Sequence, residues 1–126
     1  MKKIKLPNAP EPKGHYSSAV VHNGLIFVSG QLPINHETGE EITDSIEAQT
    51  EQCLRNVEAV LLMAGSDLNH VLKFTIFVSA ENLWGAVNET YARILGEHKP
   101  ARAIIPAGKF RGNFLIEIEA IAEVKE

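Results

Sequence analysis

Residues 114–124, Phe-Leu-Ile-Glu-Ile-Glu-Ala-Ile-Ala-Glu-Val, follow a period-2 pattern. Successive side chains of a β-strand point to opposite faces of the sheet, so this segment is predicted to be a strand with one apolar face. The apolar face carries Ile116, Ile118, Ala120, Ala122 and Val124, and the other face carries Leu115, Glu117, Glu119, Ile121 and Glu123. Because the second face is only half polar, we expect part of it to be covered.

The remaining elements can be placed around this strand. Residues 17–21 and 25–28 read as two strands joined by a tight turn at Asn23-Gly24, and residues 71–78 read as another strand. A helix is predicted after Asp44, an N-cap candidate with Glu47 three residues on, and it ends at Gly65. A second helix is predicted over 82–95, followed by a strand around Arg102. Residues 1–6 are compatible with a short edge strand, and 7–14 read as a loop.

This order predicts a single α+β domain over residues 1–126, with two helices on one face of a mixed sheet. Two helices cannot cover both faces of five or six strands. Residues 25–28 and 71–78 are nevertheless largely apolar and need burial on both sides. We therefore expect other copies of the chain to cover the second face, in a closed homo-oligomer.

Composition excludes several classes of function. The formal net charge is −4 and the basic residues are scattered, which argues against nucleic acid as a partner. No apolar run approaches the roughly 20 residues that cross a bilayer, and no signal peptide is recognisable. The lone Cys53 is typical of a reducing compartment, so we expect a soluble, cytoplasmic protein. The five histidines lack metal-ligand spacing, and no glycine loop indicates a nucleotide or redox cofactor.

Arg102 is the first candidate for chemistry. It follows Pro100 at the start of an apolar segment, where its planar fork needs a carboxylate or an anionic ligand. Taken alone, such an arginine is more often an ion-pair residue than a site. Glu117 and Glu119 on the last strand are the obvious carboxylates, although strand glutamates are usually solvated. Opposite charges brought together under a covered surface are costly unless they pair with each other or bind a ligand.

Tyr16, Ser29 and Asn88 are further candidates, and each has an ordinary structural interpretation beside the functional one. Tyr16 follows Gly14-His15 and suits either a core aromatic or a phenol that contacts a ligand. Ser29 ends a buried strand and can cap the following turn, and no nucleophile elbow surrounds it. Asn88 lies within a helix, where it either faces solvent or reaches into a pocket.

Several motifs together resemble the RidA/YjgF family of enamine/imine deaminases. They are Val-Ser-Gly-Gln-Leu-Pro at 28–33, Thr-Gly-Glu at 38–40, Gln49 with Asn56-Val57, Val-Asn-Glu-x-Tyr at 87–91, Pro-Ala-Arg at 100–102 and Glu-Ile-Glu-Ala-Ile-Ala at 117–122. They occur in the family's order along essentially the whole chain. Their combination is far more specific than any one of them.

The resemblance implies a chorismate-mutase-like α+β fold and a homotrimer with a central barrel of sheets and ligand clefts between subunits. It implies that Arg102 binds a substrate carboxylate, that Tyr16, Ser29 and Asn88 line the same pocket, and that Arg102 and Glu117 are catalytic. The implied reaction is hydrolysis of 2-aminoacrylate and related 2-imino acids to 2-keto acids and ammonia. Neither a metal nor a cofactor is implied.

The chain departs from the family pattern at three places. His15 replaces a proline, Ala103 replaces a serine, and residues 106–113 replace the common sequence after the Arg102 strand. Pro106 should end that strand early, and the loop at 108–113 should reshape a pocket wall. These departures keep open a second hypothesis, a non-catalytic binder of 2-keto acids in the same cleft. A chaperone or ribonuclease role, also ascribed to family members, is a third. The preferred imine and the subunit that supplies each pocket residue stay open.

Overall fold

The structure is a computed structural model that describes residues 1–6 and 14–126. Its strands are β1 (Lys2–Ile4), β2 (Ala19–His22), β3 (Leu25–Gln31), β4 (Val71–Val78), β5 (Ala101–Pro106) and β6 (Ile116–Glu123). Its helices are α1 (Ile46–Met63) and α2 (Trp84–Leu95), with short 3₁₀ turns at Leu68–His70 and Glu81–Leu83. The predicted order of elements is confirmed, including the edge strand near the N-terminus. The predicted loop at 7–14 lies almost entirely outside the described residues.

The strands form one mixed sheet in the order β1-β2-β3-β6-β4-β5. β4 and β5 are parallel, and every other neighbouring pair is antiparallel. The β2–β3 turn holds Asn23 and Gly24 at φ values of 51° and 77°, as the Asn-Gly signal predicts. β6, the last strand in sequence, lies at the centre of the sheet, between β3 and β4.

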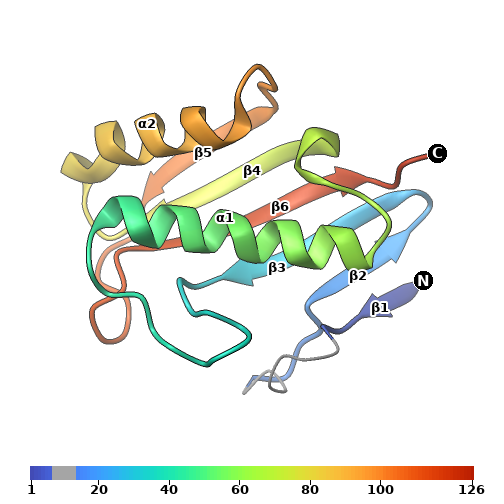
Figure 1. Cartoon of the computed structure of the whole chain (residues 1–126), viewed down its shortest axis with the longest axis horizontal. Coiled ribbons are helices and arrows are strands. Elements are labelled where there is room, and N and C mark those ends of the chain that lie inside the picture. Colours follow the sequence, from blue (N-terminus) through green and yellow to red (C-terminus); the bar gives the residue numbers. More distant parts are fainter. Residues whose placement is uncertain (7–13) are drawn as a thin grey trace.

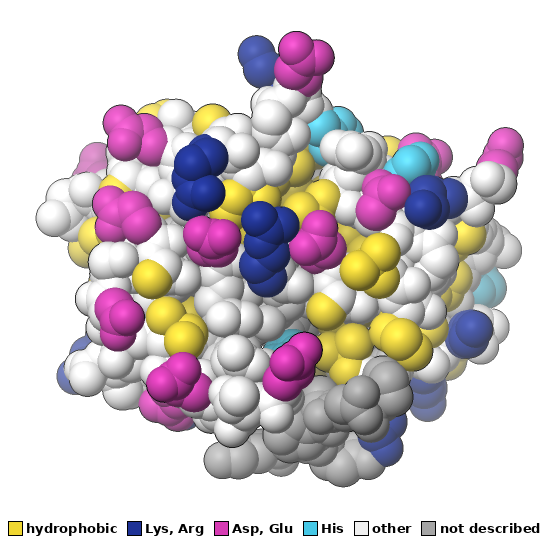
Figure 2. Space-filling view, viewed as in Figure 1, with side chains coloured by type: hydrophobic (Ala, Val, Ile, Leu, Met, Phe, Trp, Pro, Cys, Tyr) yellow, Lys and Arg dark blue, Asp and Glu magenta, His cyan; other side chains and the backbone are white. Residues whose placement is uncertain are grey.

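Both helices cover the same face of this sheet (Figure 1). α1 packs across β3 and β6, and α2 packs beside α1. The period-2 pattern of β6 is confirmed, because Ile116, Ile118, Ala120 and Ala122 are all buried beneath the helices. On the outer surface of this helical layer, acidic and basic side chains are interspersed (Figure 2).

The ends of α1 are fixed by local chemistry. Ser45, rather than the predicted Asp44, is the N-cap: its hydroxyl oxygen accepts a 3.0 Å hydrogen bond from the Ala48 N–H. At the other end Gly65 has a φ of +83°, and the Ser66 N–H donates to the Leu61 carbonyl at 2.8 Å. This is a Schellman closure, which needs a residue with positive φ and explains the predicted glycine stop.

In the part of the chain that the structure describes, no helix covers the second face of the sheet. Phe27 of β3 and Ile105 of β5 are 45% and 40% exposed. Ile121 and Phe77 lie on the same face, because Phe27 pairs with Ile121 and Phe77 pairs with Ile105. The expectation that strands 25–28 and 71–78 are buried on both sides is therefore not met by the chain alone. We call this surface of Phe27, Phe77, Ile105 and Ile121 the open sheet face.

The proline at the end of β5 limits that strand. β5 ends at Pro106, as predicted, and the Ala107 N–H then donates to the Val78 carbonyl at 2.8 Å. In the part of the chain that the structure describes, neither helix is both long and apolar enough to cross a bilayer.

Candidate functional site

Arg102 projects toward the helices. In the parallel β4–β5 register it pairs with Phe74, whose side chain is fully buried on the helical side of the sheet. Its Nη1 donates a 2.8 Å hydrogen bond to Oδ1 of Asn88 on α2. Its Cζ lies 4.9 Å from the ring centroid of Tyr91 and 5.6 Å from that of Trp84, both also on α2. The guanidinium is thus held by one amide and two aromatic rings.

No carboxylate among the described residues forms an ion pair with Arg102. A guanidinium has five N–H donors, and Asn88 takes one of them. Of the two partners open to Arg102, a carboxylate or an anionic ligand, neither Glu117 nor Glu119 forms an ion pair with it among the described residues. Its hydrogen-bond partner is instead Asn88 of α2.

Glu117 of β6 lies beside a bulge in the neighbouring strand β3. Val28 pairs with Ala120 and Gln31 pairs with Ile118, so β3 carries one extra residue at Ser29-Gly30. An ideal Cβ built on Gly30 would lie 2.8 Å from Oε2 of Glu117, so the carboxylate occupies space that only glycine leaves free. Burial, followed by the charge of Glu119, raises the pKa of Glu117 above its usual value.

Ser29 is one of the two residues of this bulge. The Ser29 hydroxyl donates to the Ser17 carbonyl at 2.7 Å, and the Ser29 N–H donates to the Ser18 carbonyl at 2.9 Å. Ser29 is therefore tied to the segment that follows Tyr16. The Tyr16 side chain itself is exposed, so it is not the core aromatic of the ordinary interpretation.

Four of the five predicted residues form two pairs in one chain, Arg102 with Asn88 and Ser29 with Glu117. Arg102 shares a sheet face with Phe74 and Ala120, whereas Glu117 pairs with Phe77 on the open sheet face. Arg102 and Glu117 therefore leave the sheet on opposite faces, with β4 between their strands. The structure brings Arg102 to Asn88, and Ser29 to the Glu117 bulge, without joining the two groups.

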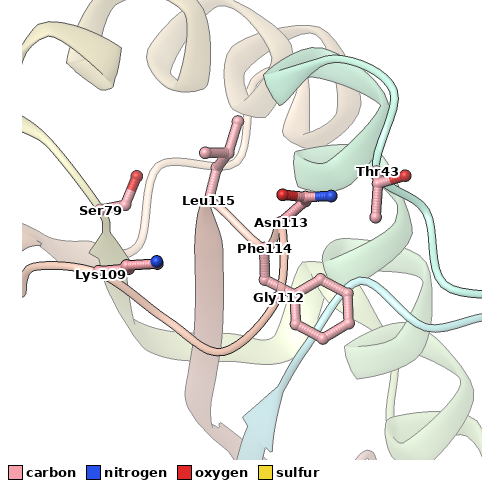
Figure 3. A pocket seen from close by; sticks show the side chains of 7 residues that line it. All are labelled: Thr43, Ser79, Lys109, Gly112, Asn113, Phe114 and Leu115. Carbon is pink, nitrogen blue, oxygen red and sulfur yellow. The ribbon is translucent and has the colours of Figure 1, made fainter.

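The loop after β5 forms a separate hollow of about 570 Å³. Its lining residues are Thr43, Ser79, Lys109, Gly112, Asn113, Phe114 and Leu115, which Figure 3 shows around it. Gln49 of α1 anchors this loop, since its amide donates to the Asn113 carbonyl and accepts from the Leu115 N–H. None of the five predicted site residues lines this hollow.

Burial also shifts the pKa values of Tyr91 and Cys53. Burial raises the pKa of Tyr91 to about 12, against a smaller opposing effect of Arg102, so its phenol stays neutral at physiological pH. Burial, with the Glu117 charge second, raises the pKa of the Cys53 thiol well above its usual value. Within residues 1–6 and 14–126, no group of three His, Cys, Asp or Glu side chains is placed to hold a metal ion.

Sequence reasoning missed two residues that contact Arg102. They are Trp84 and Tyr91 of α2. The available signal was spacing: residues 84, 88 and 91 fall on one face of a helix, and Asn88 was already a candidate.

A mixed six-stranded sheet with two helices on one face, and an arginine held against the second helix, define a small α+β domain with a cationic site at the sheet edge. The chain belongs to the RidA/YjgF family. A family model described as Endoribonuclease L-PSP matches residues 6–124.

Individual relatives cover nearly the whole chain. A RutC family protein of Pyrococcus horikoshii is 44% identical over 115 residues, which are 91% of each protein. The 2-iminobutanoate/2-iminopropanoate deaminase of Escherichia coli K12 is 39% identical over 124 residues, 96% of each.

Solved structures share the fold. The Escherichia coli YjgF gene product has a TM-score of 0.90 and 38% identity, covering 99% of this chain and 100% of that one. Escherichia coli TdcF, solved with bound serine, has a TM-score of 0.90 and 30% identity with the same coverage.

Proposed function

We propose that this protein hydrolyses small 2-imino acids and their enamine tautomers, of the 2-aminoacrylate type, to 2-keto acids and ammonia in the cytoplasm. The observation that carries the proposal is the state of Arg102: a guanidinium oriented by Asn88 and two rings, without a carboxylate partner among the described residues. A planar fork of this kind suits a bidentate carboxylate. The similarity to a named imine deaminase and to a serine-bound relative points to the same ligand chemistry.

The reaction needs few groups. The carbon of a protonated C=N bond is already electrophilic, so water can add to it once the substrate is held. Arg102 grips the carboxylate and fixes the position of that carbon. Glu117, whose pKa is raised by burial, orients the water and takes its proton as the C–O bond forms. Glu117 passes this proton to the nitrogen, and as the C–N bond breaks the carbinol hydroxyl gives its proton back to Glu117 and becomes the carbonyl of the 2-keto acid. The released ammonia takes that proton and leaves as ammonium, so the carboxylate of Glu117 is regenerated.

We assign the two halves of the site to two copies of the chain. Arg102 and Asn88 come from one copy, and Glu117, Ser29 and Tyr16 come from its neighbour. The opposite directions of Arg102 and Glu117 support this assignment, because one chain does not join them. The apolar open sheet face supports a closed homotrimer whose sheets face a central barrel.

A non-catalytic role as a sensor of 2-keto acids is the second candidate. The observation that favours it is the loop at residues 108–113, which departs from the family pattern and lines the hollow described above. Such a protein would bind 2-ketobutyrate without accelerating imine decay. A ribonuclease role, suggested by the family model's description, finds less support, because the chain carries a net charge of −4.

A coupled assay tests the proposal. A pyridoxal-phosphate-dependent dehydratase generates the imine from serine or threonine, and the decay of that imine is followed with and without this protein. We expect the native chain to accelerate the decay and Arg102→Ala to abolish the acceleration, with Arg93→Ala on α2 as the matched control. Decay that is equally fast with Arg102→Ala would reject the proposal. Native binding of 2-ketobutyrate without acceleration would select the sensor.

A further inference from the structure

Three residues of α2 form one stripe that contacts Arg102. Trp84, Asn88 and Tyr91 are spaced at i, i+4 and i+7, which places them on one side of the helix. The amide lies between the two rings along the stripe, and each of the three touches the guanidinium. We call Trp84, Asn88 and Tyr91 the arginine stripe.

The two rings differ in how they are held. Tyr91 is only 6% exposed and packs edge-on against Phe74, with ring centroids 5.4 Å apart and planes at 82°. Because Phe74 is also the β4 partner of Arg102, this contact ties Tyr91 to the strand pair that carries the guanidinium. Trp84 is 48% exposed, so its ring covers Arg102 from the solvent side of the site.

We propose that Trp84 and Tyr91 are positioning residues that orient the Arg102 guanidinium for a ligand carboxylate. This inference rests on the proposed function. The Cζ atom of Arg102 lies over both rings, and Asn88 accepts a hydrogen bond from one N–H of the guanidinium. The other in-plane donors stay available for a bidentate carboxylate, and the side chain loses less freedom on binding because it is already ordered.

Trp84 offers the sharper test, since a half-exposed ring can be changed with little effect on the core. Trp84→Leu removes the cation–π contact, and Trp84→Phe retains one. The affinity for 2-ketobutyrate is measured by isothermal titration calorimetry, and KM and kcat come from the coupled assay. We expect Trp84→Leu to weaken affinity and raise KM by about 3- to 10-fold, the usual range of one such contact, with kcat within about twofold. Trp84→Phe should stay close to native.

Leu62→Ala is the matched control. Leu62 lies on α1, is 62% exposed, and is absent from the contacts of Arg102. We expect this variant to bind and react as the native protein does. An unchanged affinity in Trp84→Leu, or an equal loss in Trp84→Phe and Trp84→Leu, would overturn the positioning role.

A second readout needs no ligand. Trp84 is the only tryptophan of the chain, so intrinsic fluorescence reports its surroundings alone. Arg102→Ala should uncover the ring and shift its emission to longer wavelength, whereas Arg93→Ala, an exposed arginine on the same helix, should leave it unchanged. Tyr91→Phe keeps a ring against the guanidinium and should leave both the emission and the affinity near native.

The outcomes separate the two proposals. Native protein that binds 2-ketobutyrate through Arg102 but does not speed imine decay would reject the deaminase and keep the positioning role. Emission that is indifferent to Arg102→Ala, in a protein that does speed imine decay, would reject the positioning role and keep the deaminase. Native protein that neither binds 2-ketobutyrate nor speeds imine decay would reject both.

Discussion

The carboxylate of Glu117 lies against the backbone of Gly30, in space that a Cβ at position 30 would enter. The contact places this carboxylate of the central strand β6 beside the bulge in β3. A methyl group at residue 30 would meet the far end of a flexible side chain, rather than backbone. The carboxylate, and not the sheet, is therefore the part that must move.

Gly30→Ala should accordingly separate activity from stability. We expect imine hydrolysis to fall by about tenfold or more, since small displacements of a catalytic group cost that much. The thermal unfolding midpoint should stay within a few degrees of native. Gly85→Ala is the control, because a Cβ there meets nothing within 4 Å and alanine favours a helix interior. Native activity in Gly30→Ala would contradict the role given to Glu117.

Asn88→Asp should block the ligand site with an internal partner. A carboxylate at position 88 would pair with the guanidinium that Asn88 now contacts at 2.8 Å. We expect 2-ketobutyrate affinity to fall by about tenfold or more, because a ligand carboxylate must displace this ion pair, while the fold is retained. Calorimetric titration checks the affinity. If Asn88→Asp binds as tightly as the native chain, Arg102 is not the carboxylate site.

Phe27→Glu should disrupt assembly. Phe27 lies on the open sheet face opposite Ile121, and a carboxylate buried there between copies would have no partner. Size-exclusion chromatography with light scattering should give about three times the 13.8 kDa chain mass for the native protein and a smaller particle for the variant. Leu62→Glu, on the helical face, should leave the native mass unchanged. A native particle of single-chain mass would contradict the trimer.

Asp67 should contribute to stability in a pH-dependent way. Its hydrogen bond from His70 at 2.7 Å, with Lys125 at 3.3 Å, lowers its pKa in the folded state. A carboxyl group whose pKa is lowered by folding stabilises the folded state at pH values above its unfolded-state pKa. This stabilisation is lost as the pH falls through the folded-state pKa. Asp67→Asn should therefore lower the thermal unfolding midpoint at pH 7 by about 1–3 °C relative to the native protein. This difference in midpoint between variant and native protein should disappear at acidic pH. A difference in unfolding midpoint that stays constant with pH would contradict this explanation.

Much of the fold could be predicted from local pattern. Period-2 alternation identified β6 and its buried face, and the Asn23-Gly24 turn and the Gly65 stop are both positions that require positive φ. The N-cap was misplaced by one residue, because Asp44 and Ser45 are both good caps and local sequence does not choose between them. That choice depends on how the helix packs on the sheet.

The candidate site was predicted as a set of residue types, but not as an arrangement. Arg102 and Glu117 point to opposite faces of the sheet because β4 lies between β5 and β6 and because of the register of these strands. The sequence around each residue encodes neither the strand order nor the register. The bulge at Ser29-Gly30 has the same origin, since it appears only when β3 pairs with β6. The contact of Trp84 with Arg102 could not be predicted either, because it depends on β5 lying beside α2.

The most direct test of the account mixes two inactive variants. One chain carries Arg102→Ala and the other Glu117→Gln, and the two are unfolded together and refolded at equal amounts. If each site takes Arg102 from one copy and Glu117 from its neighbour, about one quarter of the sites in randomly mixed closed trimers are intact, and the imine-hydrolysis rate should recover to about that fraction. A mixture as inactive as the two separate variants, with mixed trimers verified by mass spectrometry, would contradict the shared site.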